Sequence, residues 1–200
     1  MKIIVRFFEW IKKIPYPLAC LLIWVIYYPY SIIFTDILDH YHIEYSQKVS
    51  ASIPELIQFL DISRGEYHQI WVPLIEEMAF RWLPMILLFG LVLNPLWRNR
   101  GLTKEKYYGI ERWSLLIYAI VSNIIFGITH GNVYNIFIQG VAGVNYITIY
   151  LRGYFIRRDK GLRTRGQLIP LVEAFVFHFF TNQMFHIMYY YNLGHILWRG

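Results

Sequence analysis

Two adjacent carboxylates and an arginine interrupt an apolar stretch of the chain. Glu76, Glu77 and Arg81 lie in LIEEMAFRWLP, residues 74–84, within a segment that otherwise has the composition of a membrane span. A charged side chain at the centre of a span costs about 2.5 to 3.5 kcal/mol. Glu77 and Arg81 share one helical face and can neutralise each other, but Glu76 lies about 100° around the helix and keeps no local partner. An intramembrane carboxylate of this kind indicates a functional site.

Three further polar side chains occur in apolar segments. FGITHGN ends one segment with His130, and FVFHFFTNQMF places His178 and Asn182 four residues apart, on one face of a helix. Taken singly, a histidine or an asparagine in a span is typical of a hydrogen bond between helices. Their occurrence together with Glu76 on three predicted helices favours one shared polar site.

The elements that must position these residues are membrane helices. The 200 residues are 56% hydrophobic and only 16% charged, which excludes an ordinary soluble domain. Segments of about 20 mostly apolar residues can be placed five times along the chain. The predicted spans are residues 16–35, 67–93, 114–130, 132–151 and 168–190. We therefore expect an all-α membrane protein, residues 1–200 forming a single integral membrane domain with about five transmembrane helices.

Residues outside the spans add two predicted helices on the membrane surface. Residues 1–15 have an amphipathic pattern with basic residues on the polar face, which predicts an N-terminal interfacial helix. A similar helical spacing of apolar residues predicts a short surface helix over residues 46–60.

Basic residues predict the orientation. Lys and Arg number 4 in the N-terminal segment, 2 in residues 36–66, 5 in the loop 94–113 and 6 in the loop 152–167. The positive-inside rule places the N-terminus and the two basic loops in the cytoplasm and the C-terminus outside, as in an integral protein of a prokaryotic cytoplasmic membrane. The net charge of +6 therefore indicates contact with the lipid bilayer and its anionic headgroups, and no nucleic acid partner.

Three motifs occur in order along the apolar segments. They are E-E-x-x-x-R starting at Glu76, F-x-x-x-H ending at His130, and H-x-x-x-N starting at His178. In order and approximate separation they resemble the motifs of the CPBP family of intramembrane glutamic proteases. That family includes the type II CAAX prenyl endopeptidases, the Abi proteins linked to bacteriocin immunity, and the myxosortase-type processing enzymes. The resemblance covers residues 67–190, which would form the catalytic core.

The resemblance implies an intramembrane endopeptidase that hydrolyses a peptide bond of a membrane-anchored protein or peptide substrate, with removal of a C-terminal sorting or CAAX-like segment as one form of the reaction. Glu76 would be the general base that takes a proton from water, and His130 would hold and polarise that water. His178 and Asn182 would donate hydrogen bonds to the oxyanion of the tetrahedral intermediate.

The same resemblance gives three residues a supporting role. Glu77 and Arg81 would orient the motif helix, and Phe126 belongs to the motif that ends at His130.

The predicted orientation opens the site toward the outer half of the bilayer. That favours cleavage near the exported end of the substrate, as in the myxosortase-like branch.

Other hydrolytic chemistries are weighed by the residues that they require. Zinc held by Glu76, His130 and His178 would make a three-ligand catalytic site. The sequence lacks HExxH, and Asn182 is a poor zinc ligand, so we expect no cofactor and keep zinc as the alternative. A rhomboid-type serine protease needs Gly-x-Ser, which is absent. An aspartyl protease needs carboxylates in two spans, and the aspartates fall near or outside span ends.

Two non-enzymatic alternatives stay open. The first is a bacteriocin-immunity or peptide-binding membrane protein that holds a peptide without cutting it. The second is a small transporter with Glu76 as a proton relay. Glu173, five residues before His178, is left with three alternatives: it orients a histidine, pairs with Arg152 or faces a polar cavity.

Overall fold

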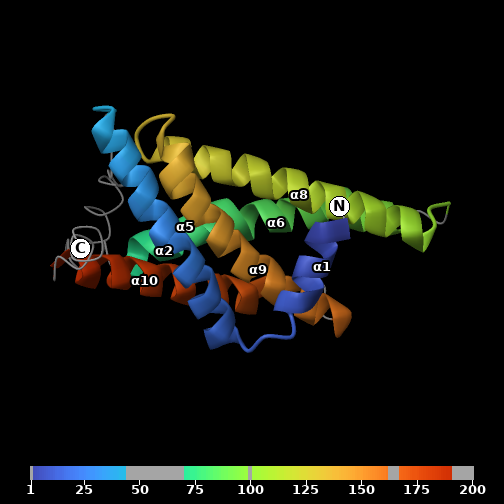
Figure 1. Cartoon of the computed structure of the whole chain (residues 1–200). Coiled ribbons are helices and arrows are strands. Elements are labelled where there is room, and N and C mark those ends of the chain that lie inside the picture. The colour runs from blue at the N-terminus through green and yellow to red at the C-terminus, as the bar shows by residue number, and fades with distance from the viewer. Residues whose placement is uncertain (1, 44–69, 99–100, 162–166, 191–200) are drawn as a thin grey trace.

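The computed structural model describes residues 2–43, 70–98, 101–161 and 167–190 (Figure 1). Every regular element in these residues is helical, which confirms the all-helical prediction. The predicted surface helix over residues 46–60 lies outside the described residues. The elements are α1 (Lys2–Ile11), α2 (Tyr16–His40), α5 (Val72–Glu77), η2 (Met78–Trp82), α6 (Leu83–Leu87), η3 (Leu88–Leu93), α7 (Asn94–Arg98), α8 (Lys104–Thr129), η4 (Ile136–Gly140), α9 (Val141–Asp159) and α10 (Leu168–Tyr190).

Three helical segments of the described chain are long and apolar enough to cross a membrane. They are Tyr16–His40, Val72–Arg98 and Lys104–Thr129. Helices α9 and α10 overlap the other two predicted spans, 132–151 and 168–190, but length and composition do not identify them as spans among the described residues. The predicted count of five is therefore not confirmed.

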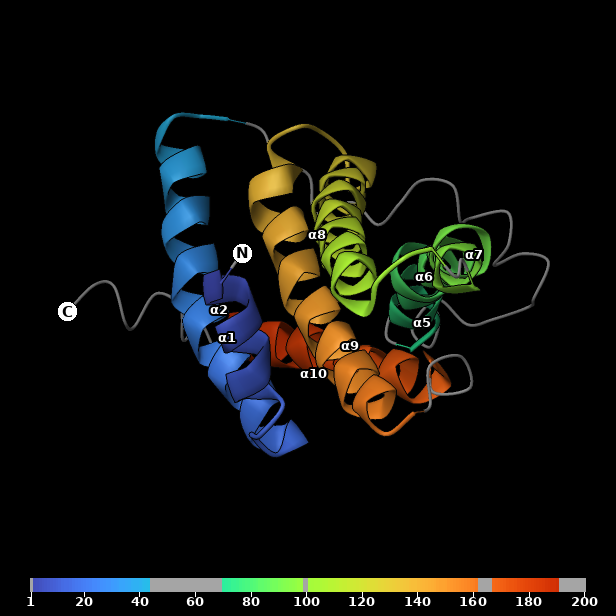
Figure 2. The same cartoon turned by 90° about the vertical axis from the view of Figure 1, so that its right-hand side faces the viewer.

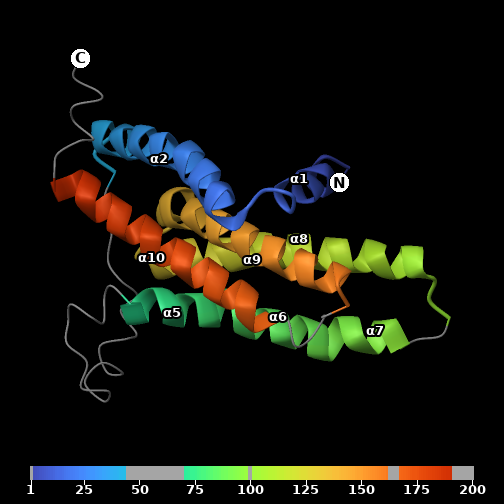
Figure 3. The same ribbon diagram turned by 90° about the horizontal axis from the view of Figure 1, so that it is seen from below.

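The helices are arranged around α9. Figure 2 shows α2, α9 and α8 side by side, with α5, α6 and α7 beyond α8, and the contacts of α9 with α2, α8 and α10 agree with this order. Figure 3 shows that the segment from α5 to α7 runs antiparallel to α8 and that α10 crosses toward α5. The beginning of α5 and the end of α8 therefore lie at the same end of the bundle, where α10 also passes.

The predicted loop 152–167 is wrong in its first half, because α9 continues to Asp159. Arg157 and Arg158, in this last part of α9, have carboxylate partners on neighbouring helices. Arg157 pairs with Glu173 of α10 at 3.1 Å, and Arg158 pairs with the fully buried Glu111 of α8 at 2.9 Å. The Arg157 pair gives Glu173 a partner that none of its three alternatives named. The predicted loop 94–113 is likewise largely helical, since α7 and α8 cover most of it.

Helix α1 is fixed to α9 by polar contacts. Arg152, one of the alternative partners of Glu173, is buried and donates instead to the carbonyl oxygens of Ile11 (3.1 Å) and Ile14 (2.6 Å). Lys12 Nζ lies 2.6 Å from Asp159 Oδ2. Partial burial alone would raise the pKa of Asp159, but hydrogen bonds from Lys12 and Arg158 outweigh it and hold this pKa below its usual value. The helix ends at Ile11, so residues 12–15 of the predicted interfacial helix are not helical, and the interfacial position of α1 stays a prediction.

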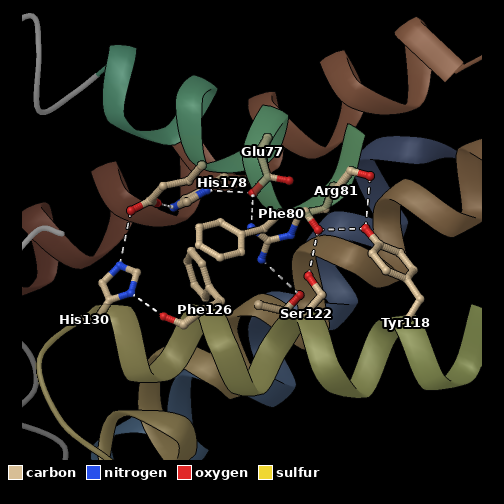
Figure 4. A network of polar contacts seen from close by, with 10 residues as sticks. Glu77, Phe80, Arg81, Tyr118, Ser122, Phe126, His130 and His178 are labelled. Atoms are coloured by element: carbon tan, nitrogen blue, oxygen red, sulfur yellow. Dashed lines mark hydrogen bonds and ion pairs between the residues drawn. The ribbon is translucent and has the colours of Figure 1, made fainter. Parts of the chain in front are cut away.

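The segment that carries the carboxylates contains a π-helical turn, η2, between α5 and α6. Pro84 has no amide hydrogen, so the carbonyl of Phe80 loses its usual helical donor four residues later. Two hydroxyl groups of α8 replace it: Tyr118 Oη and Ser122 Oγ each donate to the Phe80 carbonyl oxygen at 2.7 Å. Tyr118 Oη is also within 3.0 Å of the Arg81 carbonyl oxygen. These bonds fix the motif helix against α8 (Figure 4).

Removal of both hydroxyls is expected to destabilise this contact. We expect Tyr118→Phe and Ser122→Ala each to lower the free energy of unfolding by about 0.6 to 1.7 kcal/mol, the range for hydrogen bonds between membrane helices. The double variant should cost more than either single change, because the Phe80 carbonyl then loses both of its hydroxyl donors. Unfolding of the purified protein in detergent measures this. Tyr134→Phe, in the turn after α8, is the matched control. Equal stability of the double variant and this control would contradict the role of the hydroxyls.

Candidate functional site

Side chains from three helical elements converge on Glu76. This carboxylate of α5 is only 4% exposed. Its Oε1 lies 3.3 Å from Nε2 of His130, the residue that caps the end of α8, and its Oε2 lies 3.6 Å from Nε2 of His178 on α10. Both histidines are buried as well. The structure thus brings together three of the four residues expected to act directly in the reaction.

Hydrogen bonds at Nδ1 of His130 and of His178 restrict which nitrogen of each ring carries a proton. His130 Nδ1 lies 2.7 Å from the carbonyl oxygen of Phe126, which can only accept, so Nδ1 carries a proton. A neutral His130 then presents the unprotonated Nε2 to Glu76. His178 Nδ1 lies 2.9 Å from Oε1 of Glu77, and an ionised Glu77 fixes the same tautomer. Nε2 of each ring faces the Glu76 carboxylate, so a proton carried by the carboxyl group or by either Nε2 can be shared between them.

Glu77 links this pair of histidines to a buried cation. Its Oε1 lies 3.2 Å from Nη1 of Arg81, and both side chains are fully buried. The pairing expected from their spacing is therefore present. Figure 4 shows Glu77 between His178 and Arg81, so one carboxylate oxygen serves both partners. The sequence spacing alone did not indicate the contact with His178, because it joins residues 101 positions apart.

Aromatic rings enclose the Arg81 guanidinium. Its central carbon lies 4.4 Å from the centroid of the Phe126 ring and 5.5 Å from that of Tyr146. Phe126 thus holds Arg81 through its ring and His130 through its carbonyl oxygen. The ring of Tyr146 also stacks on His178, with centroids 4.0 Å apart and planes at 16°. A desolvated guanidinium on aromatic faces gains about 2 kcal/mol or more, which offsets part of the cost of its burial.

Gly143 of α9 makes room for this arrangement. A Cβ at Gly143 would lie 3.0 Å from Arg81 Nη2 and 3.0 Å from Cδ1 of Phe126, and it would collide with Oδ1 of Asn123. The Gly143 carbonyl oxygen accepts from Arg81 Nη2 at 3.4 Å. The absence of a side chain on α9 at this point therefore allows Arg81 to lie against its backbone.

Asn182 lies on α10, four residues after His178, and is half-buried. The helix places both on the same face, as their spacing predicted. The contacts that join Glu76, Glu77 and the two histidines do not include Asn182. Its role as an oxyanion donor therefore stays a prediction.

Several residues that form the site lay outside the sequence motifs. Tyr118, Ser122 and Asn123 precede the motif that ends at His130, and Gly143 and Tyr146 belong to a helix without a motif. A signal was present in α8: Tyr118, Ser122 and Phe126 recur every four residues, so the face that carries Phe126 also carries two hydroxyls.

Metal binding was the alternative for the same side chains. Within the residues that the structure describes, no group of three or more His, Cys, Asp or Glu side chains is arranged to hold a metal ion. The alternative of zinc on Glu76, His130 and His178 stays a prediction.

The chain was also compared with known proteins. It matches no model of a protein family, and no curated protein and no solved structure is significantly similar to it. The function must therefore be inferred from the geometry of the site and from the motif residues.

Proposed function

We propose that this protein is an intramembrane endopeptidase of the CPBP type, which uses a water molecule activated by Glu76 to hydrolyse a peptide bond of a membrane-anchored substrate. The observation that carries the proposal is the convergence of the Glu76 carboxylate with Nε2 of His130 and of His178, on three helices and out of contact with bulk water. Each contact alone fits a structural hydrogen bond. A carboxylate beside two imidazole nitrogens fits the binding of a water at their edge, since water can donate one hydrogen bond to the carboxylate and one to an unprotonated Nε2.

The proposed reaction begins with this water. Its oxygen attacks the carbonyl carbon of the scissile peptide bond while Glu76 takes one of its protons. Nε2 of His130 accepts the second hydrogen bond of the water and orients a lone pair toward the substrate. The tetrahedral intermediate then carries the negative charge on the former carbonyl oxygen.

The oxyanion needs hydrogen-bond donors. Because Nδ1 of His178 donates to Glu77, Nε2 becomes a donor only when the ring is a cation, and the Glu77 carboxylate stabilises that cation. Asn182 supplies the second donor. When the intermediate collapses, the proton on Glu76 passes to the leaving nitrogen, which yields a free amine and a carboxylic acid. Glu77 thus has a further part in the proposal besides its pair with Arg81, and no cofactor enters any step.

The position of the site in the bundle bears on the substrate. Glu76 is the fifth residue of α5, about 6 Å from the start of the helix, and His130 follows the last residue of α8. In the proposed topology, with the N-terminus in the cytoplasm and the C-terminus outside, this end of the bundle faces outward. The proposed cleavage is then near the exported end of a membrane segment, as in removal of a C-terminal sorting helix.

A comparison of cleavage products tests the proposal. Cells carrying the wild-type chain or Glu76→Gln are analysed for the C-termini of membrane proteins and for released peptides. We expect a defined set of truncated C-termini to be present with wild type and absent with Glu76→Gln, at equal levels of the two proteins. Identical peptide sets would argue against proteolysis and leave peptide binding or immunity as the function.

A further inference from the structure

A groove that Glu76, His130 and His178 do not line has the features of a lipid site. It lies among α1, α8 and α9 and has a volume of about 240 Å³. Apolar side chains from all three helices form most of its walls; they include Phe8, Leu116, Ile120, Val144 and Phe155. This volume is below the roughly 300 to 1,000 Å³ of pockets that enclose a whole small molecule. The groove therefore suits one aliphatic chain of a larger molecule.

The charged residues of the groove gather at one end. Glu9, Arg112 and Arg158 line it together with the apolar side chains, and Asn123 lines it further along α8. Arg112 and Asn123 are 11 residues apart on α8, about 16 Å along the helix, so the groove is long and narrow with polar groups at its two ends.

One of these charges has no partner among the described residues. Glu9 pairs with Lys12, and Arg158 pairs with Glu111 and Asp159. Arg112 is exposed, and no hydrogen bond or ion pair joins it to another part of the described chain.

Arg112 lies at a position along α8 that is typical of residues at the membrane surface. Trp113 follows it and is 56% exposed, and Trp10 of the amphipathic α1 is 53% exposed. Exposed tryptophans beside basic residues are typical of the headgroup level of a bilayer. An unpaired guanidinium at this level attracts phosphate, and an aliphatic chain attached to the same molecule can extend along the groove toward Asn123.

From these observations we infer that the groove among α1, α8 and α9 binds an anionic phospholipid, with its phosphate at Arg112 and one acyl chain between α8 and α9. The bilayer that surrounds the spans supplies this ligand. Basic pockets between membrane helices recognise anionic headgroups by the same chemistry. The far end of the groove reaches Asn123, whose Oδ1 lies beside Gly143 and thus close to the contact of Arg81 with α9. A bound acyl chain would therefore support the helix pair that holds the buried arginine.

Lipid retention by the purified full-length protein tests the inference. The protein is reconstituted in nanodiscs of equal parts phosphatidylglycerol and phosphatidylcholine, transferred to detergent, and analysed for bound lipid by native mass spectrometry. We expect phosphatidylglycerol to be enriched about fivefold over phosphatidylcholine, the factor for one favourable basic contact with an anionic headgroup. Arg112→Gln should abolish the enrichment. Arg98→Gln, which removes an exposed basic residue of α7 outside the groove, should leave it unchanged.

A second variant tests the position of the chain. Thr148 lines the groove and is half-buried, so Thr148→Phe should fill it and lower retention of both phospholipids, while the unfolding temperature shows whether the variant is folded. Equal retention of the two lipids by wild type, or unchanged enrichment in Arg112→Gln, would overturn the inference. Displacement of phosphatidylglycerol by added oleate at an equal concentration would also overturn it, because the ligand would then be a free fatty acid.

Discussion

Replacing Glu76 with glutamine is expected to lower the rate of substrate cleavage by about 10²- to 10⁴-fold, the range for loss of a positioned general base. Glutamine keeps the size and shape of the side chain but cannot take the proton of the attacking water. It can also still make a hydrogen bond to the ring of His130 or of His178, which the carboxylate meets at 3.3 and 3.6 Å. The fold should therefore be retained. Cleavage of a substrate found by the comparison of C-termini, followed with the purified protein and that substrate in detergent, gives the rate.

A matched control separates this effect from a general loss of charge. Glu105, in the first turn of α8, is exposed, and Glu105→Gln removes the same charge far along that helix from His130. We expect this variant to cleave at the wild-type rate. A Glu76→Gln protein that is folded and cleaves as fast as Glu105→Gln would remove Glu76 from the mechanism.

Arg81→Met should have the largest effect on stability, with a loss of about 3 to 5 kcal/mol in the free energy of unfolding. Methionine has a similar length but leaves Glu77, which is fully buried, without its cation. Breaking a buried pair by removal of one partner has a cost of this size, because an uncompensated charge remains. Chemical unfolding of the purified protein in detergent, monitored by circular dichroism, measures the loss. Arg98→Met, an exposed change of the same chemistry, should cost little.

The double variant Glu77→Gln with Arg81→Met tests the cause. If the unpaired carboxylate causes the loss, removal of its charge should restore a large part of the stability, and the sum of the two single effects should exceed the effect of the double change. Strictly additive losses would show that the cost comes from packing around Arg81 and not from the ion pair. The double variant should also be a poor enzyme, since His178 loses the carboxylate at its Nδ1.

Much of the fold could be predicted from the sequence, because the length of an apolar segment and the spacing of residues within it depend only on residues close in the chain. The positions of α2 and α8, the helical character of the motif segment and the pair of Glu77 with Arg81 all follow from residues close in the chain. The ends of helices were harder to predict. Arg152, Arg157 and Arg158 suggested a loop, yet α9 continues through all three, because each finds an acceptor on another element.

The site could be predicted as a set of residues but not as a geometry. Types and spacing identified Glu76, His130 and His178, and the structure brings their side chains together. Which nitrogen of each imidazole ring carries a proton depends on contacts between distant parts of the chain, such as the contact of Glu77 with His178. The stacking of Tyr146 on His178 has the same origin, since it joins two helices that no motif connects. No local pattern carries such information.

The π-helical turn Met78–Trp82 fixes the angular position of the carboxylates. A π turn holds one residue more than an α turn, so it rotates everything before it relative to everything after it. Removal of one residue from this turn, with return to a regular α helix, would rotate α5 by about 100° about its axis. Glu76 and Glu77 would then point away from His130 and His178, although every motif residue would still be present. Phe80 belongs to this turn, so the two hydroxyls of α8 that donate to its carbonyl oxygen also support the direction of the two carboxylates.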